Sequence, residues 1–155
     1  MDYLDYPRMV VEDVVRLRRR IRDSRLPMKL VDRNLIIGTW NIRSLSRVYE
    51  AWEENPGSPK RNLRSMACIA EIVRRFDVLA IQEVKRNTMA IRMLQEAFLG
   101  SNWGLILSDV SAGSGGNAER LAFLYDKRRV EPSGLAGEIV LPPTEDGVPA
   151  RQFDR

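Results

Sequence analysis

Two short apolar runs in this chain each end in a polar residue. The first covers residues 35–41 and ends in Asn41, and the second covers residues 77–83 and ends in Glu83. Because runs this short favour strands and a helical pattern separates them, they are expected to be parallel strands of one sheet. Ligands of open α/β sheets bind at the carboxyl edge of such strands. The pattern therefore predicts that Asn41 and Glu83 lie at a ligand-binding edge.

The same patterning predicts the remaining elements. Helices are expected from Pro7 to about Arg25, from Ser58 as cap with Pro59 in the first turn, and from Thr88 to Gly100; strands are expected at 103–108, 120–126 and 130–141, and a loop at 44–58. Right-handed strand–helix–strand connections make the first three strands parallel, and the fourth returns antiparallel beside them. The residues expected at the shared edge are Asn41, Glu83, Lys85, Asn117, Glu119, Arg120 and Arg155. The prediction is an α/β fold with a mixed sheet and flanking helices.

An N-terminal amphipathic helix is predicted within residues 1–27, ahead of this domain. Its apolar stripe consists of Val10, Val14, Leu17 and Ile21, and the arginines Arg16, Arg19, Arg20 and Arg22 lie mostly off that stripe. The pattern fits either a clamp for nucleic acid or a solvated helix face that packs on the domain. Basic surface helices are common and carry no mechanism by themselves, so the solvated face is the favoured interpretation.

Composition limits the class of protein. The 155 residues are 44% hydrophobic and 30% charged, as expected for one globular domain with its own core. No apolar run approaches the length of a membrane span, no signal peptide opens the sequence, and the single cysteine allows no intramolecular disulfide. These features favour a cytoplasmic location. The net charge of +4 mildly favours a polyanionic partner such as nucleic acid.

The absence of histidine narrows the possible chemistry. Without histidine and with one cysteine, any metal is expected to be held by oxygen, which favours Mg²⁺, Mn²⁺ or Ca²⁺ over Zn²⁺. Glu83 is a suitable hard ligand, and Asn41 can support a ligand or donate to a phosphate oxygen. Lys85 and Arg155 could bind phosphate. The residue types alone favour the plainer interpretation, in which Asn41 forms a turn and Glu83 solvates a strand end.

Four ordered motifs resemble the endonuclease/exonuclease/phosphatase superfamily, the relatives of deoxyribonuclease I. They are Thr39-Trp40-Asn41-Ile42-Arg43, Ile81-Gln82-Glu83-Val84-Lys85, Glu119-Arg120-Leu121-Ala122-Phe123-Leu124-Tyr125 and Gln152-Phe153-Asp154-Arg155. The resemblance covers roughly residues 33–155. It implies a four-layered α/β sandwich and divalent-metal-dependent cleavage of phosphate esters, often in DNA.

The resemblance also implies a role for each matching residue. Glu83 corresponds to the metal ligand, and Asn41 to the residue that positions the metal-site groups and the phosphate. Glu119 corresponds to an acid that partners a catalytic histidine. Lys85 and Asn117 correspond to positions that approach the nucleic acid strand, and Arg155 to an arginine near the scissile phosphate.

The sequence departs from the family pattern in its second half. The Gly-Asp-Phe-Asn-like motif and the terminal Asp-His pair are absent. Residues 33–155 are therefore expected to be the front half of such a domain, with a site that places a metal and a phosphate but cannot activate water. A sheet without its natural neighbours is also expected to self-associate.

Two classes of function remain open from the sequence. The first is the N-terminal portion of a metal-dependent phosphodiesterase, foremost an endo- or exonuclease acting on DNA, with a phosphatase acting on lipid or inositol phosphates as a variant. The second is a non-catalytic module that binds nucleic acid or protein.

Overall fold

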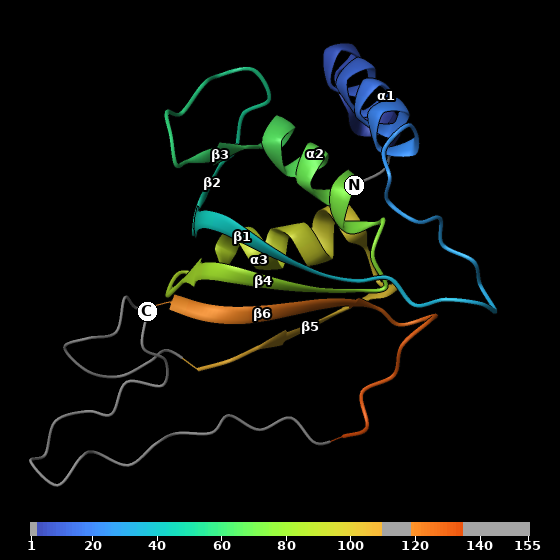
Figure 1. The fold of residues 1–155 in the computed structure, drawn as a ribbon. Helices are drawn as coiled ribbons and strands as arrows, with labels where there is room; N and C mark the ends of the chain where they lie inside the picture. Colours follow the sequence, from blue (N-terminus) through green and yellow to red (C-terminus); the bar gives the residue numbers. More distant parts are fainter. Residues whose placement is uncertain (1–2, 110–118, 135–155) are drawn as a thin grey trace, which may run out of the picture.

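The computed structural model describes residues 3–109 and 119–134, which form one mixed sheet with helices packed on it (Figure 1). Across the sheet the order is β1 (Ile37–Leu45), β4 (Val78–Lys85), β6 (Glu119–Asp126) and β5 (Trp103–Leu107). β1 and β4 are parallel, and β6 runs antiparallel to both β4 and β5. β5 therefore points the same way as β1 and β4, as predicted, although β6 separates it from them. The predicted α/β class with a mixed sheet is confirmed.

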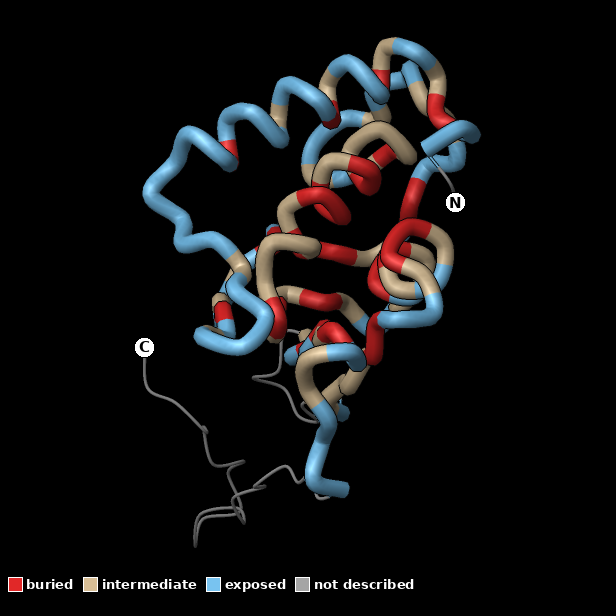
Figure 2. The backbone as a smooth tube through the Cα atoms, turned by 90° about the vertical axis from the view of Figure 1, so that its right-hand side faces the viewer, coloured by how far each residue is buried: buried red, intermediate tan, exposed pale blue. Residues whose placement is uncertain are grey.

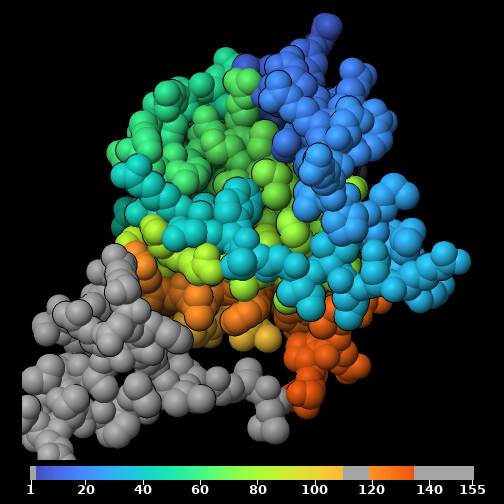
Figure 3. Space-filling view, in the orientation of Figure 1, coloured from blue at the N-terminus to red at the C-terminus, as the bar shows by residue number. Residues whose placement is uncertain are grey.

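The α-helices of the described residues gather on one side of this sheet (Figure 2). They are α1 (Arg8–Arg22), α2 (Leu63–Val73) and α3 (Met89–Met93); a π-helical segment, η2 (Leu94–Leu99), continues α3, and a 3-10 turn, η1 (Tyr3–Asp5), precedes α1. Inward side chains of the strands, such as Ile81 and Leu124, share one core with Met66 of α2 and Phe98 of η2. α1 packs on α2 as the outermost layer, and in the space-filling view the blue atoms of the N-terminal helix lie against the green atoms of the region that contains α2 (Figure 3). No helix in the described ranges is long and apolar enough to cross a membrane.

The second helix begins later than predicted. Its cap is Asn62 rather than Ser58, because the Asn62 carboxamide accepts hydrogen bonds from the backbone N–H (2.9 Å) and the hydroxyl (2.8 Å) of Ser65. Two short parallel strands precede the helix, β2 (Val48–Tyr49) and β3 (Arg61–Asn62). β2 lies where a loop was predicted and β3 where a helix was predicted.

Other predicted boundaries also differ. β1 continues to Leu45, because its pairing with β4 shifts after Asn41 and resumes between Leu45 and Val84. Thr88 precedes α3 but makes no side-chain capping hydrogen bond. Residues 130–134 are not a strand, and the rest of that predicted strand lies outside the described residues.

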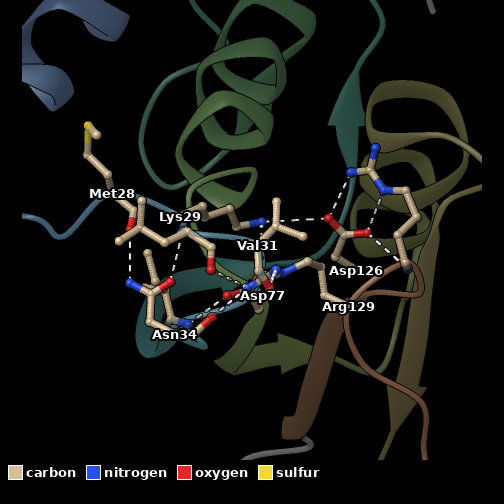
Figure 4. A network of polar contacts seen from close by, with 10 residues as sticks. Met28, Lys29, Val31, Asn34, Asp77, Asp126 and Arg129 are labelled. Carbon is tan, nitrogen blue, oxygen red and sulfur yellow. Dashed lines mark hydrogen bonds and ion pairs between the residues drawn. The ribbon is translucent and has the colours of Figure 1, made fainter.

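A buried polar network fixes the amino-terminal end of β4, opposite the predicted site (Figure 4). Asp77 is fully buried and accepts hydrogen bonds from the Ile36 N–H (2.6 Å) and from Arg129 Nε (3.0 Å). Lys29 Nζ lies 3.3 Å from Asp77 and 3.6 Å from the buried Asp126. Burial raises the pKa of Asp77, but these hydrogen bonds and the Lys29 charge outweigh it, so the pKa lies below its usual range. The carboxylate therefore stays ionised in the interior.

The same arginine ties the segment before β1 to the sheet. Besides Asp77, the Arg129 guanidinium donates hydrogen bonds to the backbone carbonyls of Val31, Asn34 and Leu30. One side chain thus satisfies three carbonyl oxygens of a segment that has no regular secondary structure. The network holds residues 28–36 against the ends of β4 and β6.

The face of the sheet away from the helices exposes apolar side chains. Ile37 is 69%, Leu121 44% and Phe123 38% exposed, whereas the intervening Ala122 and Leu124 are fully buried against the helices. Pairing continues this outer row from Phe123 to Ala80 on β4 and Ile106 on β5. Exposed apolar rows of this kind promote association.

We expect the chain to self-associate and to bind a hydrophobic dye through this outer face. Replacing Phe123 by glutamine should weaken both signals, measured by light scattering and dye fluorescence. Leu4→Gln is the control, because Leu4 is 91% exposed but lies on η1, away from the sheet. A monomer at high concentration with no dye signal would contradict the expectation.

Candidate active site at the carboxyl edge of the sheet

The carboxyl ends of β1 and β4 bring together the two residues that the sequence singled out. In the parallel register Asn41 pairs with Gln82, the residue before Glu83. The Asn41 side chain hydrogen-bonds the Glu83 carboxylate. The predicted proximity is confirmed, and the chemical roles of the two residues stay predictions.

A bulge in β4 places Glu83. The buried positions of β4 are Leu79, Ile81 and Val84, so the two-residue alternation breaks after Ile81, where the pairing with β6 also shifts. Glu83 has a φ of 60°, and Ser44 on the facing strand has a φ of 50°, both in the left-handed region that residues with a side chain rarely adopt. Such conformations persist only where the surroundings fix them, and bulges often re-aim a side chain beside an active site. The backbone here is shaped around the Glu83 side chain.

The Glu83 carboxylate is held in its charged form. Hydrogen bonds from the Asn41 side chain and from the Ser44 N–H (3.1 Å) lower the pKa of Glu83. Partial desolvation opposes them, and the positive charges of Lys85 and Arg43 lower the pKa further. At neutral pH the edge therefore presents an anionic oxygen donor without a competing proton.

Lys85 and Glu119 form an ion pair next to this carboxylate. They occupy paired positions on β4 and β6, and Lys85 Nζ lies 2.6 Å from Glu119 Oε1. The following residue, Arg120, donates to the backbone carbonyl of Ser108 (2.8 Å) and so ties the end of β5 to β6. Lys85 and Glu119 therefore both lie at the predicted edge, where they form an ion pair with each other.

A basic groove of about 780 Å³ opens beside the edge, between β1, α2 and the loop that precedes α2. Asn41 and Trp40 line it, together with the cations Arg43, Lys60 and Arg61. Arg61 donates to the backbone carbonyl of Arg43 (3.1 Å), which joins the loop to the end of β1, and within the described residues Arg61 forms no ion pair with a carboxylate. The groove therefore offers several positive charges to an anionic ligand.

Not every predicted site residue can be placed. Asn117 and Arg155 lie outside the described residues. Sequence reasoning did not identify Ser44, whose role comes from its backbone N–H and carries no signal in the residue type. It also missed the groove, although the adjacent cations Lys60 and Arg61 after the predicted turn were visible in the sequence.

Comparison with known proteins agrees with this geometry. A sequence model of the Endonuclease/Exonuclease/phosphatase family matches residues 38–147. The match begins within β1 and includes Asn41, Glu83, Lys85 and Glu119. The chain therefore belongs to the endonuclease/exonuclease/phosphatase family, a family of metal-dependent phosphoesterases. A search of curated proteins gave no match.

The donors at the edge suit a hard divalent cation. The described residues contain no group of three or more histidine, cysteine, aspartate or glutamate side chains arranged to hold a metal. Mg²⁺ nevertheless binds typically through one or two carboxylates and completes its shell with water and substrate phosphate. An ionised Glu83 with the Asn41 carboxamide beside it matches that pattern, so these two residues would hold the ion.

Proposed function

We propose that this chain takes part in the divalent-metal-dependent hydrolysis of phosphodiester bonds in DNA, with Glu83 as the metal ligand. The observation that carries this proposal is the bulge that aims an ionised Glu83 carboxylate at the sheet edge, hydrogen-bonded by Asn41 and Ser44. The cation, Mg²⁺ and alternatively Mn²⁺ or Ca²⁺, would polarise a phosphoryl oxygen and stabilise the charge that develops on it. Asn41 orients the Glu83 carboxylate.

The basic groove supports a polymeric substrate over a small phosphate ester. Arg43, Lys60 and Arg61 line the groove together with Asn41, so it offers three positive charges to an anionic ligand beside the proposed metal site. Contacts of this kind position a nucleic acid backbone without reading its sequence. A phosphatase acting on lipid or inositol phosphates would not need this additional set of positive charges.

In this proposal the sheet forms the first half of a four-layered sandwich. Its support is the uncovered outer face that includes Ile37, Leu121 and Phe123, which is apolar enough to pack against a second sheet. Lys85 would approach the DNA strand, and Glu119 would support a further catalytic group once released from Lys85. Asn117 and Arg155 keep the substrate-binding roles expected from the family resemblance.

A non-catalytic binding module is the second candidate. It is favoured by the absence of histidine from the chain and by the engagement of Glu119 with Lys85 at 2.6 Å, which leaves no evident general base among the described residues. A module of this kind would use the same metal site and groove to bind DNA without cleaving it.

We expect the 155-residue chain to bind duplex DNA more tightly with Mg²⁺ than with EDTA, yet to release no product. Loss of a general base alone typically lowers a rate by a factor of about a hundred to ten thousand. One gel assay with end-labelled DNA reports both binding and cleavage. Binding unaffected by Mg²⁺ would refute the proposed metal site.

Cleavage of the DNA in the same assay would contradict the expectation that the chain releases no product. Turnover that survives stringent purification and disappears in Glu83→Gln would show that the chain is an active enzyme by itself. In that case the expectation of an inactive chain, and with it the binding-module alternative, would be wrong.

A further inference from the structure

α1 is the outermost helix, and it precedes the region that the family model matches. Its buried residues are Val10, Val14 and Ile21, which lie on one stripe against the domain. In Figure 2 short buried stretches alternate along α1 with exposed turns that face away from α2. The apolar face of the helix is therefore used inside the protein.

Two ion pairs on opposite sides of this stripe fix the rotation of α1. On one side the Arg18 guanidinium binds both carboxylate oxygens of Glu71, at 2.7 and 2.9 Å. On the other side Asp13 binds Arg64, with a closest distance of 2.5 Å. Glu71 is almost completely buried, so the helix cannot roll without breaking a bidentate pair. The opposite face of α1 is thereby held toward solvent.

Most charged residues of α1 have a close ion-pair partner, either within the helix or on a neighbouring segment, but three arginines do not. Arg8 pairs with Glu12 at 3.0 Å and Arg22 with Asp23 at 3.4 Å. The exceptions are Arg16, Arg19 and Arg20, which we call the arginine triad. The closest carboxylate to Arg16 is that of Asp13, 4.0 Å away and already bound by Arg64, and in the described parts of the chain Arg19 and Arg20 form no ion pair.

We propose that the arginine triad binds the phosphate backbone of duplex DNA without any metal, at a surface separate from the carboxyl edge. Residues 16 to 20 span about 6 Å along the helix axis at 1.5 Å per residue. Duplex DNA carries about one phosphate charge per 1.7 Å of its axis, so a stretch of that length presents several phosphates, and neutralising them releases counterions. The inference goes beyond the proposed function, because it involves neither Glu83 nor catalysis.

An anionic membrane is the other partner that a basic helix can serve. Helices that lie on membranes insert their apolar face between the lipids. In α1 that face is packed on α2 and locked by Arg18 and Asp13. The geometry therefore favours nucleic acid, whose recognition needs only the charged face.

The test measures binding of a fluorescent 20-base-pair duplex in EDTA by anisotropy over a range of salt concentrations. We expect the triple variant Arg16→Gln, Arg19→Gln, Arg20→Gln to lose about tenfold or more in affinity at low salt, with a log–log salt slope smaller by about two to three. The control is Arg33→Gln, Arg92→Gln, Lys127→Gln, which removes the same charge from exposed positions outside α1. Circular dichroism verifies that both variants are folded.

Equal losses in the two triple variants would overturn the proposal, since net charge alone would then explain binding. The same proteins are tested against vesicles that contain phosphatidylserine. Triad-dependent vesicle binding without triad-dependent DNA binding would also overturn it, in favour of a membrane surface. Because EDTA removes the metal, these results do not depend on the outcome for Glu83.

Discussion

Replacing Asp77 by asparagine is expected to lower the free energy of unfolding by about 3 to 5 kcal/mol, the typical cost of removing one partner from a buried ion pair. Asp77 is fully buried, and its loss of charge leaves Arg129 and Lys29 without their common anion. Urea denaturation followed by circular dichroism measures the change. The control is Asp32→Asn, an exposed aspartate of the segment before β1 that the network holds in place.

The effect of Asp77 should also depend on pH. Because its pKa in the folded state lies below that in the unfolded chain, its charge stabilises the fold above the unfolded value of about 3.9. That contribution is lost as the pH falls through the folded value. The wild-type chain should therefore lose stability in acid more steeply than Asp77→Asn. Equal acid sensitivity in the two proteins would show that Asp77 is not ionised in the fold.

Replacing Glu83 by glutamine is expected to weaken Mn²⁺ binding by about tenfold or more, because the variant removes the negative charge that a hard cation requires. Glutamine keeps the size of the side chain and can still accept the Ser44 N–H hydrogen bond. The fold should therefore be retained. Since the pKa of Glu83 lies below its usual range, Mn²⁺ affinity of the wild-type chain should be nearly constant between about pH 6 and 8.

Glu53→Gln is the matched control for this variant. Glu53 lines the basic groove, so its replacement removes the same charge from the groove, and the causes of the lowered Glu83 pKa do not include Glu53. If both variants weakened Mn²⁺ binding to the same extent, the ion would be bound by the general field of the groove and not by Glu83.

The shared edge was predictable because it follows from topology. Short apolar runs separated by a helix dictate parallel strands, and the last polar residue of each run must then meet at one edge. That reasoning placed Asn41 near Glu83, and the antiparallel return of the fourth strand placed Glu119 at the same edge, where the structure pairs it with Lys85. Strand direction and alternation are local properties that a sequence displays.

The bulge was not predictable in the same way. Neither glutamate nor serine favours the left-handed region, so the residue types of Glu83 and Ser44 do not predict the bulge. The start of α2 was missed for a related reason. Ser58 and Pro59 are good helix-start residues, but the carboxamide of Asn62 makes the capping bonds in the folded chain.

The Asp77 network shows a third feature that could not be predicted from the sequence. Arg129 reaches the carbonyl of Asn34 across 95 residues of sequence and Asp77 across 52. Pairings of this kind depend on how the ends of β4 and β6 meet, which periodicity does not describe. The arginine triad was partly predictable. The sequence showed that one face of the helix is basic, but the ion pairs of Arg18 and Asp13 in the folded chain were needed to show which way that face points.

Whether Glu83 binds a divalent metal at the carboxyl edge can be measured by electron paramagnetic resonance of free Mn²⁺ during titration with the protein. We expect one saturable site in the wild-type chain and in Glu53→Gln, and loss of that site in Glu83→Gln. Added Mg²⁺ should displace the Mn²⁺. Saturable binding that survives unchanged in Glu83→Gln would contradict the account.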